Sequence, residues 1–193
     1  EETLTVLGPY SDWNRGYFAE LVEILDADAD KAPAVIGVDV VFSGTNDSES
    51  DLSLVNAASE YDNIVLASTL TIDDYVYRKG NGEYALGSYV STEGKPFDKL
   101  AEVADYGFTN AIYDNDGYVR KAYTHFTSQK DNISYKSFAY AVSQKLGTTS
   151  EFPSVIEIAY TGNVGDFEKI SMSDVLNGTV PPSHFADSVV LVG

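Results

Sequence analysis

The most chemically suggestive residue of this chain is Asp39, because it interrupts the otherwise apolar run from Ala34 to Phe42. A run of this kind predicts a central strand with helices on both faces. A carboxylate inside it must be paired, hydrogen-bonded or near the strand end, because an unpaired buried charge is costly. Ligands of open α/β sheets bind at the carboxyl ends of parallel strands. Asp39 is therefore either a ligand-contacting acid or a structural acid that binds the amides of the next loop, and we favour the structural role.

A second group of charged residues lies in the segment from Asp114 to Gly117 and at Arg120. A calcium loop of the EF-hand type is excluded, because Gly117 at its sixth position would place Ile112 and Tyr123 where carboxylates are required. Asp-Gly instead predicts a tight turn between two strands. Arg120 either forms a salt bridge with an aspartate of this turn, which is the simpler interpretation, or presents its guanidinium to an anionic ligand.

No arrangement of residues in the sequence predicts catalysis. There are two histidines, and although Ser183, His184 and Asp187 are close in sequence, no nucleophile elbow accompanies them. The absence of cysteine excludes disulfides, thiolate catalysis and zinc–thiolate sites. Because no zinc-protease, phosphate-loop or dinucleotide fingerprint is present either, we expect no catalytic residue, no cofactor and no resident metal.

Charge and composition narrow the class of partner. The net charge is −18, with 30 acidic and 12 basic residues, so the chain repels nucleic acid and anionic lipid surfaces.

A length of 193 residues with 44% hydrophobic residues fits one α/β domain. The absence of cysteine fits an oxidising compartment. The apolar runs are too short to span a membrane, and the chain begins with Glu, so we expect a piece of a longer protein.

The first half of the chain predicts a β-α-β unit. An amphipathic helix is expected from Trp13 to Leu25, a strand from Ala34 to Phe42, a helix from Leu52 to Ser59 and a strand from Asn63 to Leu70. The crossover length implies that the two strands are parallel. Arg15 is unusual at a helix start, where the dipole disfavours a cation, so we expect a specific partner such as Asp39 or a neighbouring loop.

Two β-hairpins are predicted next. The first runs from Asp73 to Ser91, where tyrosines alternate with polar residues around Gly80-Asn81-Gly82. Its tyrosines either form a recognition surface or pack on the domain, and the sequence leaves both open. The second hairpin is expected to pair Gly107–Ile112 with Tyr118–Phe126.

The remaining segments complete an α/β domain. We expect a helix from Tyr135 to Leu146, a strand from Val155 to Tyr160, a short helix after a capping box at Ser171 and a final strand from Ser188 to Val192. The fold class is therefore α/β: a single domain with a central mixed, largely parallel sheet flanked by helices, with one or two β-hairpins.

Taken in order, these sequence segments resemble the CHASE2 family of extracellular sensory domains over nearly the whole chain. The residues that carry the resemblance are Trp13 and Arg15 at the first helix, the strand with Asp39, the stretch of Gly107, Asn110, Asp114, Gly117 and Arg120, and the closing strand Val189 to Gly193. The Asp73 to Ser91 hairpin matches nothing in the family pattern.

The resemblance implies a role. Residues 1–193 would be a non-catalytic, ligand-sensing domain on the extracellular side of the bacterial cytoplasmic membrane, flanked by transmembrane helices and joined to a cyclase or kinase output. The ligand would be a small molecule or a protein, with a homodimer also expected. We expect any pocket near Asp39, Asn110 and Arg120. The alternatives are a surface module that binds a protein partner through the tyrosine hairpin and, less favoured, an α/β hydrolytic enzyme.

The resemblance also bears on the two ends of the sheet. The family opens with an apolar strand that leads into an acidic turn, and Glu1 to Leu4 is similar to that turn. We therefore expect the opening strand to be missing, Thr3 to Leu7 to be helical or irregular, and one sheet edge to be uncovered.

Overall fold

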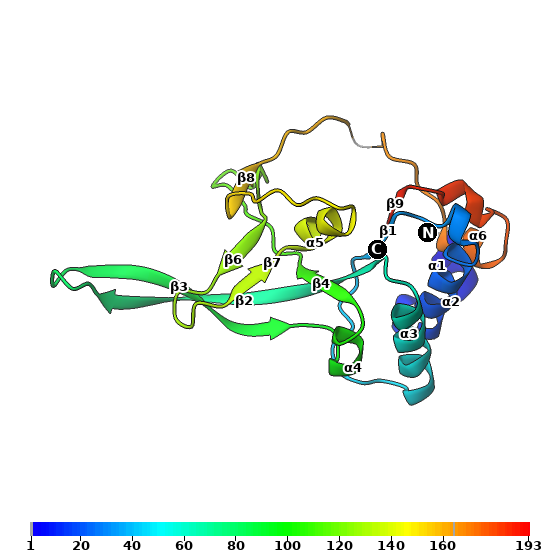
Figure 1. Cartoon of the computed structure of the whole chain (residues 1–193), viewed down its shortest axis with the longest axis horizontal. Coiled ribbons are helices and arrows are strands. Elements are labelled where there is room, and N and C mark those ends of the chain that lie inside the picture. The colour runs from blue at the N-terminus through cyan, green and yellow to red at the C-terminus, as the bar shows by residue number, and fades with distance from the viewer. Residues whose placement is uncertain (1, 164) are drawn as a thin grey trace.

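The protein folds as three layers around a parallel sheet (Figure 1). The computed structural model describes residues 2–163 and 165–193. The parallel strands lie in the order β4–β2–β1–β9, where β1 is Val35–Val38, β2 begins at Ile64, β4 is Asp105–Phe108 and β9 is Val189–Val192. Helices cover both faces, which confirms the predicted α/β class with a central, largely parallel sheet.

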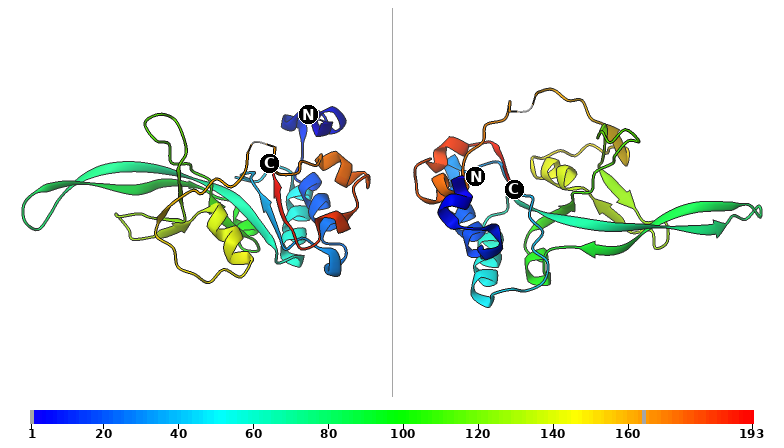
Figure 2. Two further views of the ribbon diagram at one scale, coloured as in Figure 1. Left: turned by 90° about the horizontal axis from the view of Figure 1, so that it is seen from above. Right: turned by 180° about the vertical axis from the view of Figure 1, so that it is seen from behind.

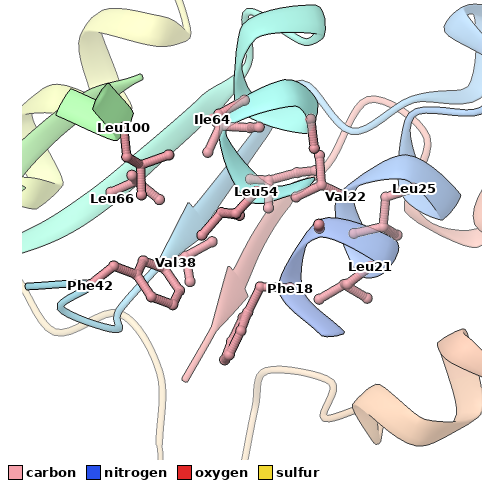
Figure 3. Close-up of a cluster of buried hydrophobic side chains, with 14 of the residues drawn as sticks. Phe18, Leu21, Val22, Leu25, Val38, Phe42, Leu54, Ile64, Leu66 and Leu100 are labelled. Atoms are coloured by element: carbon pink, nitrogen blue, oxygen red, sulfur yellow. The ribbon is translucent and has the colours of Figure 1, made fainter. Parts of the chain in front are cut away.

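The larger core lies between the sheet and the helices α2 (Gly16–Leu25) and α3 (Ser48–Glu60). The helix face predicted from the apolar spacing is buried, as Figure 3 shows for Phe18, Leu21, Val22 and Leu25. It packs with Leu54 of α3 against alternate strand residues, among them Ile36, Val38, Ile64 and Leu66. Full burial of each such side chain stabilises the fold by about 1.5–3 kcal/mol, so this layer dominates the stability.

The opposite face of the sheet is covered by α5 (Phe138–Lys145), which packs Ala141 and Val142 against Val35 and Val65. The start of α5 approaches β4 closely at Gly107. A Cβ at that position would lie 2.5 Å from the carbonyl carbon and oxygen of Ser137. Only glycine fits there, so the close contact fixes where α5 crosses the sheet.

The central strand β1 is shorter than the predicted run but occupies the predicted place. All of its residues from Val35 to Val38 are buried, between β2 and β9. Asp39 lies immediately after the strand and is exposed, and its N–H donates a hydrogen bond of 2.7 Å to the carbonyl of Val192. The chain then turns and returns Phe42 to the core, which is why the apolar run is longer than the strand.

The strand β2 does not end at Leu70, as the sequence suggested, but continues to Arg78 and leaves the body of the domain. There it pairs antiparallel with β3 (Tyr84–Gly94), so the predicted hairpin is confirmed. Figures 1 and 2 show this two-stranded ribbon projecting far from the rest of the molecule. We call residues 72–90 the arm.

The second predicted hairpin is wrong in its pairing. Gly107 belongs to β4, which pairs parallel with β2, and only an isolated bridge between Ile112 and Lys121 joins the two expected strands. The downstream segment divides into β5 (Lys121–Tyr123), paired with β8 (Val155–Glu157), and β6 (His125–Thr127), paired with β7 (Ser134–Lys136). Hydrogen bonds from Thr109 and Asn110 to β2 hold the chain at the sheet and prevent a hairpin from forming there.

The smaller elements complete the domain. They are α1 (Glu2–Leu7), α4 (Asp98–Ala101), α6 (Met172–Leu176) and short 3-10 turns at Tyr10–Asp12, Ala29–Lys31 and Pro182–Phe185. The helical expectation for Thr3 to Leu7 is confirmed.

Two local predictions need correction. The helix predicted from Tyr135 begins at Phe138 because Tyr135 pairs with Phe126 in a short sheet, and Ser137 caps the helix. Ser171 precedes α6 but makes no capping hydrogen bond, because its hydroxyl contacts the side chains of Thr3 and Ser173 instead.

One edge of the parallel sheet is open among the described residues. The strand β9 pairs only with β1, and its Leu191 is exposed. This agrees with the uncovered edge expected from the sequence. In the described part of the chain, no helix has the length and apolar character that crossing a membrane requires.

Candidate ligand site

Asp39 and Asn110 lie at the same edge of the sheet, where the parallel strands end. Asp39 follows β1 directly, and Asn110 lies two residues beyond the end of β4. The side chain of Asp39 is exposed and forms no hydrogen bond or ion pair with another described residue. The sequence therefore placed Asp39 correctly near the end of a strand. The favoured structural role is not supported, because the carboxylate binds no amide of the next loop among the described residues, and contact with a ligand stays a prediction.

Asn110 binds the backbone of β2. Its Oδ1 accepts a hydrogen bond of 2.8 Å from the N–H of Leu70, and its Nδ2 donates one of 2.8 Å to the carbonyl of the same residue. The amide thus pairs with β2 as a neighbouring strand would. This contact holds the end of β4 beside the point where β2 leaves the sheet for the arm.

Arg120 closes the turn that follows β4. Its Nη1 lies 2.8 Å from Asp114 Oδ2 and its Nη2 lies 2.9 Å from Asp116 Oδ2, so the predicted salt bridge forms with both aspartates. The guanidinium also lies 5.1 Å from the ring centroid of Tyr118. Its hydrogen bonds lower the pKa of Asp116. No contact among the described residues joins Arg120 to Asp39 or Asn110.

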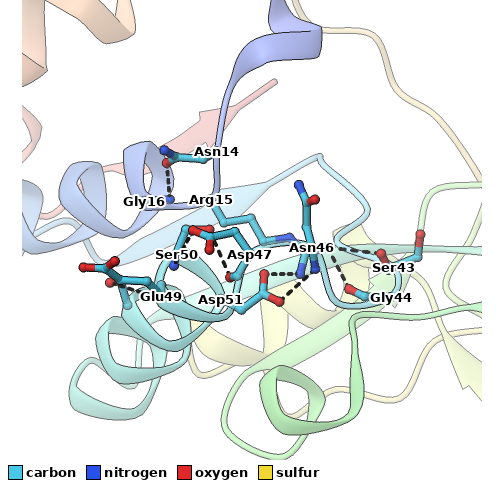
Figure 4. Close-up of polar contacts among 11 residues, drawn as sticks. Asn14, Arg15, Gly16, Ser43, Gly44, Asn46, Asp47, Glu49, Ser50 and Asp51 are labelled. Carbon is cyan, nitrogen blue, oxygen red and sulfur yellow. Dashed lines mark hydrogen bonds and ion pairs between the residues drawn. The ribbon is translucent and has the colours of Figure 1, made fainter.

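The partners of Arg15 are Asp51 of α3 and the loop after β1, not Asp39. Arg15 Nη1 lies 2.5 Å from Asp51 Oδ1, and its Nη2 donates to the carbonyls of Ser43 and Gly44 at 3.1 and 2.8 Å (Figure 4). Both charged side chains are nearly buried, at 11% and 8% exposure. Asp51 also accepts a hydrogen bond from the N–H of Asn46.

Aromatic rings complete the surroundings of Arg15. Its guanidinium lies 4.7 Å from the ring centroid of Phe97 and 5.8 Å from that of Phe42. The guanidinium is therefore held by a carboxylate, two carbonyls and two rings. We infer a structural role, because this cation fixes the path of the chain after β1 and its contacts are internal.

One cavity lies at the amino ends of β2 and β4, with a volume of about 290 Å³. Its polar wall is a chain of ion pairs in which Lys145 lies 2.7 Å from Asp62 and 3.0 Å from Asp105. Burial would raise the pKa of Asp105, but hydrogen bonds from Lys145 and Lys136 outweigh that effect and lower it. These charges already compensate one another.

A second cavity, of about 370 Å³, lies between β4 and β7. A bridge between Phe108 and Ser137 joins the ends of the two strands, and residues of both strands line the cavity. We call this cavity the β4–β7 cleft, and its polar walls include Glu93 of β3, Tyr106 of β4 and Tyr135 of β7. Neither cavity is lined by Asp39, Asn110 or Arg120.

The polar groups of the β4–β7 cleft affect one another electrostatically. Burial raises the pKa of Glu93, and the charge of Lys95 partly opposes this. Burial, followed by the negative charge of Glu93, raises the pKa of Tyr106. Burial also raises the pKa of Tyr135, with smaller effects from Asp131, Glu93 and Tyr106. One carboxyl group and two phenols therefore converge on the same space.

The sequence did not identify these three residues. They come from separate strands, and Tyr135 was expected in a helix. No local spacing connects them, because their proximity depends on the return of β3 from the arm and on the position of β7 beside β4. The only signal was the tyrosine richness of the chain, with 14 tyrosines.

The geometry offers no support for catalysis or a metal centre. Within residues 2–163 and 165–193, no group of three metal-binding side chains is present. His184 Nε2 lies 3.1 Å from Glu168, and His125 Nδ1 lies 3.0 Å from the hydroxyl of Thr124. Neither histidine contacts a serine in the part of the chain described, so the hydrolase alternative gains nothing from the structure.

Comparison with known proteins gives one match. A family model described as the CHASE2 domain matches residues 1–193, the whole chain. No curated protein matches. No solved structure matches either.

Proposed function

The chain belongs to the CHASE2 domain family of sensory domains, and we propose that it senses a ligand outside the cytoplasmic membrane of a bacterium as part of a transmembrane receptor. The observation that carries this proposal is the match of the family model to residues 1–193. Membership in this family fits a non-catalytic domain of a signalling protein. We place the ligand in the β4–β7 cleft, since a volume of about 370 Å³ is within the usual range of small-molecule sites.

The position of the cleft suggests how a ligand would act. Its walls come from three parts of the fold: the sheet edge at β4, the β7 strand that leads into α5, and β3 at the base of the arm. A ligand that contacts all three stabilises one arrangement of these parts over others. Sensing then requires only that the ligand binds the two arrangements with different affinity.

The positions of α1 and of the end of β9 support attachment of the domain to the membrane from one side. The end of β9 and the first helix α1 lie on the body of the domain, away from the tip of the arm (Figures 1 and 2). We propose that flanking transmembrane helices join the domain there and that the arm points away from the membrane. The output would be a cyclase or a kinase.

A thermal-shift screen of the purified domain tests the sensing proposal. The library would contain amino acids, amines, sugars, carboxylates and divalent cations. A ligand present at about 100 times its Kd stabilises the native state by about 2.7 kcal/mol, which raises the Tm of a domain of this size by about 5–10 °C. We expect at least one saturable rise of this kind. A folded sample that no compound stabilises contradicts small-molecule sensing.

The arm favours a second candidate function, the binding of a protein partner or a second copy. Val76 and Leu86 pair across the arm and are 65% and 68% exposed, and Tyr84 on the same face is 75% exposed. The opposite face of the arm carries Tyr75, Tyr77 and Tyr89. This face is less available to a partner, because Lys130 lies 4.3 Å from the ring centroid of Tyr89 and Gln129 contacts the same strand. An apolar face of this kind commonly marks an interaction site.

Sedimentation of a double variant tests this second candidate. We expect Val76→Ser combined with Leu86→Ser to abolish any self-association or partner capture with little change in Tm, because both side chains are exposed. Tyr118→Ser, which removes an exposed aromatic ring outside the arm, is the matched control. A double variant that associates as the unmodified domain does removes the arm from consideration.

A further inference from the structure

Glu93 is the one charge of the β4–β7 cleft without a counter-ion among the described residues. The other charges are matched: Lys136 lies 3.0 Å from Asp105, which also binds Lys145. Lys95 is close enough to influence Glu93, but its salt bridge, at 3.2 Å, is with Asp98. A half-buried carboxylate that lacks a partner costs stability, so its presence in a cavity suggests a ligand that supplies the missing charge.

The two phenols beside Glu93 add acceptors rather than cations. Tyr106 and Tyr135 both line the cleft. A phenol is uncharged at neutral pH, and burial raises the pKa of both further. A phenol oxygen can accept a hydrogen bond, and its ring face attracts a cation. Glu93 and the two tyrosines therefore suit a ligand that carries positive charge and several N–H donors.

The rest of the cleft suits the body of such a ligand. The small side chains of Ala101 and Ala104 leave space beside the polar group, and Ile133 adds an apolar side chain at the rim. An anionic ligand finds no unpaired cation there, because the lysine of the cleft is already bound to Asp105. The net charge of −18 also raises the local concentration of cations.

We propose that the β4–β7 cleft binds a small organic ammonium ion, whose charged nitrogen donates hydrogen bonds to Glu93, Tyr106 and Tyr135 and whose apolar part lies against the alanines. This inference rests on the proposed sensing function and specifies the chemical class of its ligand. The ammonium ion supplies the positive counter-charge that the Glu93 carboxylate lacks among the described residues.

Calorimetric titration of the domain with three matched probes tests the ligand class. Phenethylamine carries the ammonium group, N-acetylphenethylamine has the same ring without the charge, and 3-phenylpropanoate reverses the charge. We expect phenethylamine to bind at least tenfold more tightly than the other two. Equal binding of the three probes, or stronger binding of the carboxylate, overturns the proposal.

Variants of the cleft locate the binding. Glu93→Gln keeps the shape of the side chain and removes its charge, so we expect at least a tenfold loss of phenethylamine affinity. Tyr135→Phe should cause a smaller loss, because it removes one acceptor and keeps the ring. Glu20→Gln, which neutralises an exposed acid on α2, is the matched control and should change affinity less than twofold.

The result separates this inference from the sensing proposal. Circular dichroism of each variant shows whether it is folded, and Tyr135→Phe provides a second test if Glu93→Gln is not. Phenethylamine affinity that is unchanged in both folded variants places the amine elsewhere and overturns the inference. If the amines do not bind while the broad screen yields another ligand, sensing stands and the ammonium class is wrong.

Discussion

Removal of the Arg15 guanidinium should strongly destabilise the domain. We consider Arg15→Met, which keeps an unbranched side chain against Phe97 and Phe42 but leaves Asp51 without its cation. Asp51 is only 8% exposed, so water cannot easily replace the lost partner. The variant therefore buries an uncompensated charge at the start of α3.

The expected magnitude follows from the contacts. Breaking a buried ion pair from one side costs about 3–5 kcal/mol. The low end applies here, because Asp51 retains the hydrogen bond from Asn46 and the two carbonyls that bind Arg15 can turn to water. A loss of about 3 kcal/mol is a large share of the 5–15 kcal/mol that usually stabilises a domain.

Urea unfolding followed by circular dichroism measures this loss. With a slope of about 2–3 kcal/mol per molar, a loss of 3 kcal/mol lowers the midpoint by about 1–1.5 M. Adding Asp51→Asn to Arg15→Met should recover part of the stability, because the amide accepts the Asn46 hydrogen bond without a buried charge. A midpoint shift below about 0.3 M for Arg15→Met, or a double variant no more stable than the single one, would refute the reasoning.

Three further changes test other parts of the fold. Gly107→Ala should destabilise the domain by about 1–3 kcal/mol or more, because its Cβ would lie 2.5 Å from the backbone at the start of α5, whereas Gly80→Ala, which meets no atom within 4 Å, should have a small effect in the same urea assay. Asn110→Ala removes two hydrogen bonds to Leu70 and should cost about 1–3 kcal/mol in urea unfolding. The lowered pKa of Asp105 means that the unfolded chain binds its proton more readily, so the stability this group confers is present above about pH 4 and is lost as pH falls further. In the Asp105→Asn variant, the Tm should fall less steeply below about pH 4 than in the unmodified domain. An equally steep fall would contradict the stabilising role of the Asp105 carboxylate.

Periodicity is what made the core predictable. The spacing of Phe18, Leu21, Val22 and Leu25 encodes one helical face, and that face is buried as expected. A continuous apolar run likewise predicted β1, since both faces of a central parallel strand are covered. The run that predicted β9 forms an edge strand instead, in which Val189 and Leu191 are exposed. These elements follow from local patterns that tertiary contacts reinforce.

Elements whose pairing depends on distant residues were less predictable. Gly107 was expected in a hairpin, but its missing side chain admits the start of α5, and this packing draws the strand into the parallel sheet. The arm was recognised as a hairpin, yet its continuity with β2 was missed because Leu70 ends the apolar run while the strand continues.

The candidate site shows the same limit. Asp39, Asn110 and Arg120 were candidates from the sequence, because each carries a polar group near an expected strand end. The structure shows internal partners for Asn110 and Arg120. Glu93 and Tyr135 could not be linked from sequence, because only the path of β3 and β7 brings them to one cavity.

An amide NMR spectrum of the labelled domain, recorded against the compounds that raise its Tm, tests the central claim most directly. The account predicts that a sensed ligand shifts the resonances of Glu93, Tyr106 and Tyr135 saturably, with the largest changes confined to the β4–β7 cleft. Saturable shifts centred on Asp39, Asn110 and Arg120 would contradict the placement of the site and return it to the carboxyl edge of the sheet.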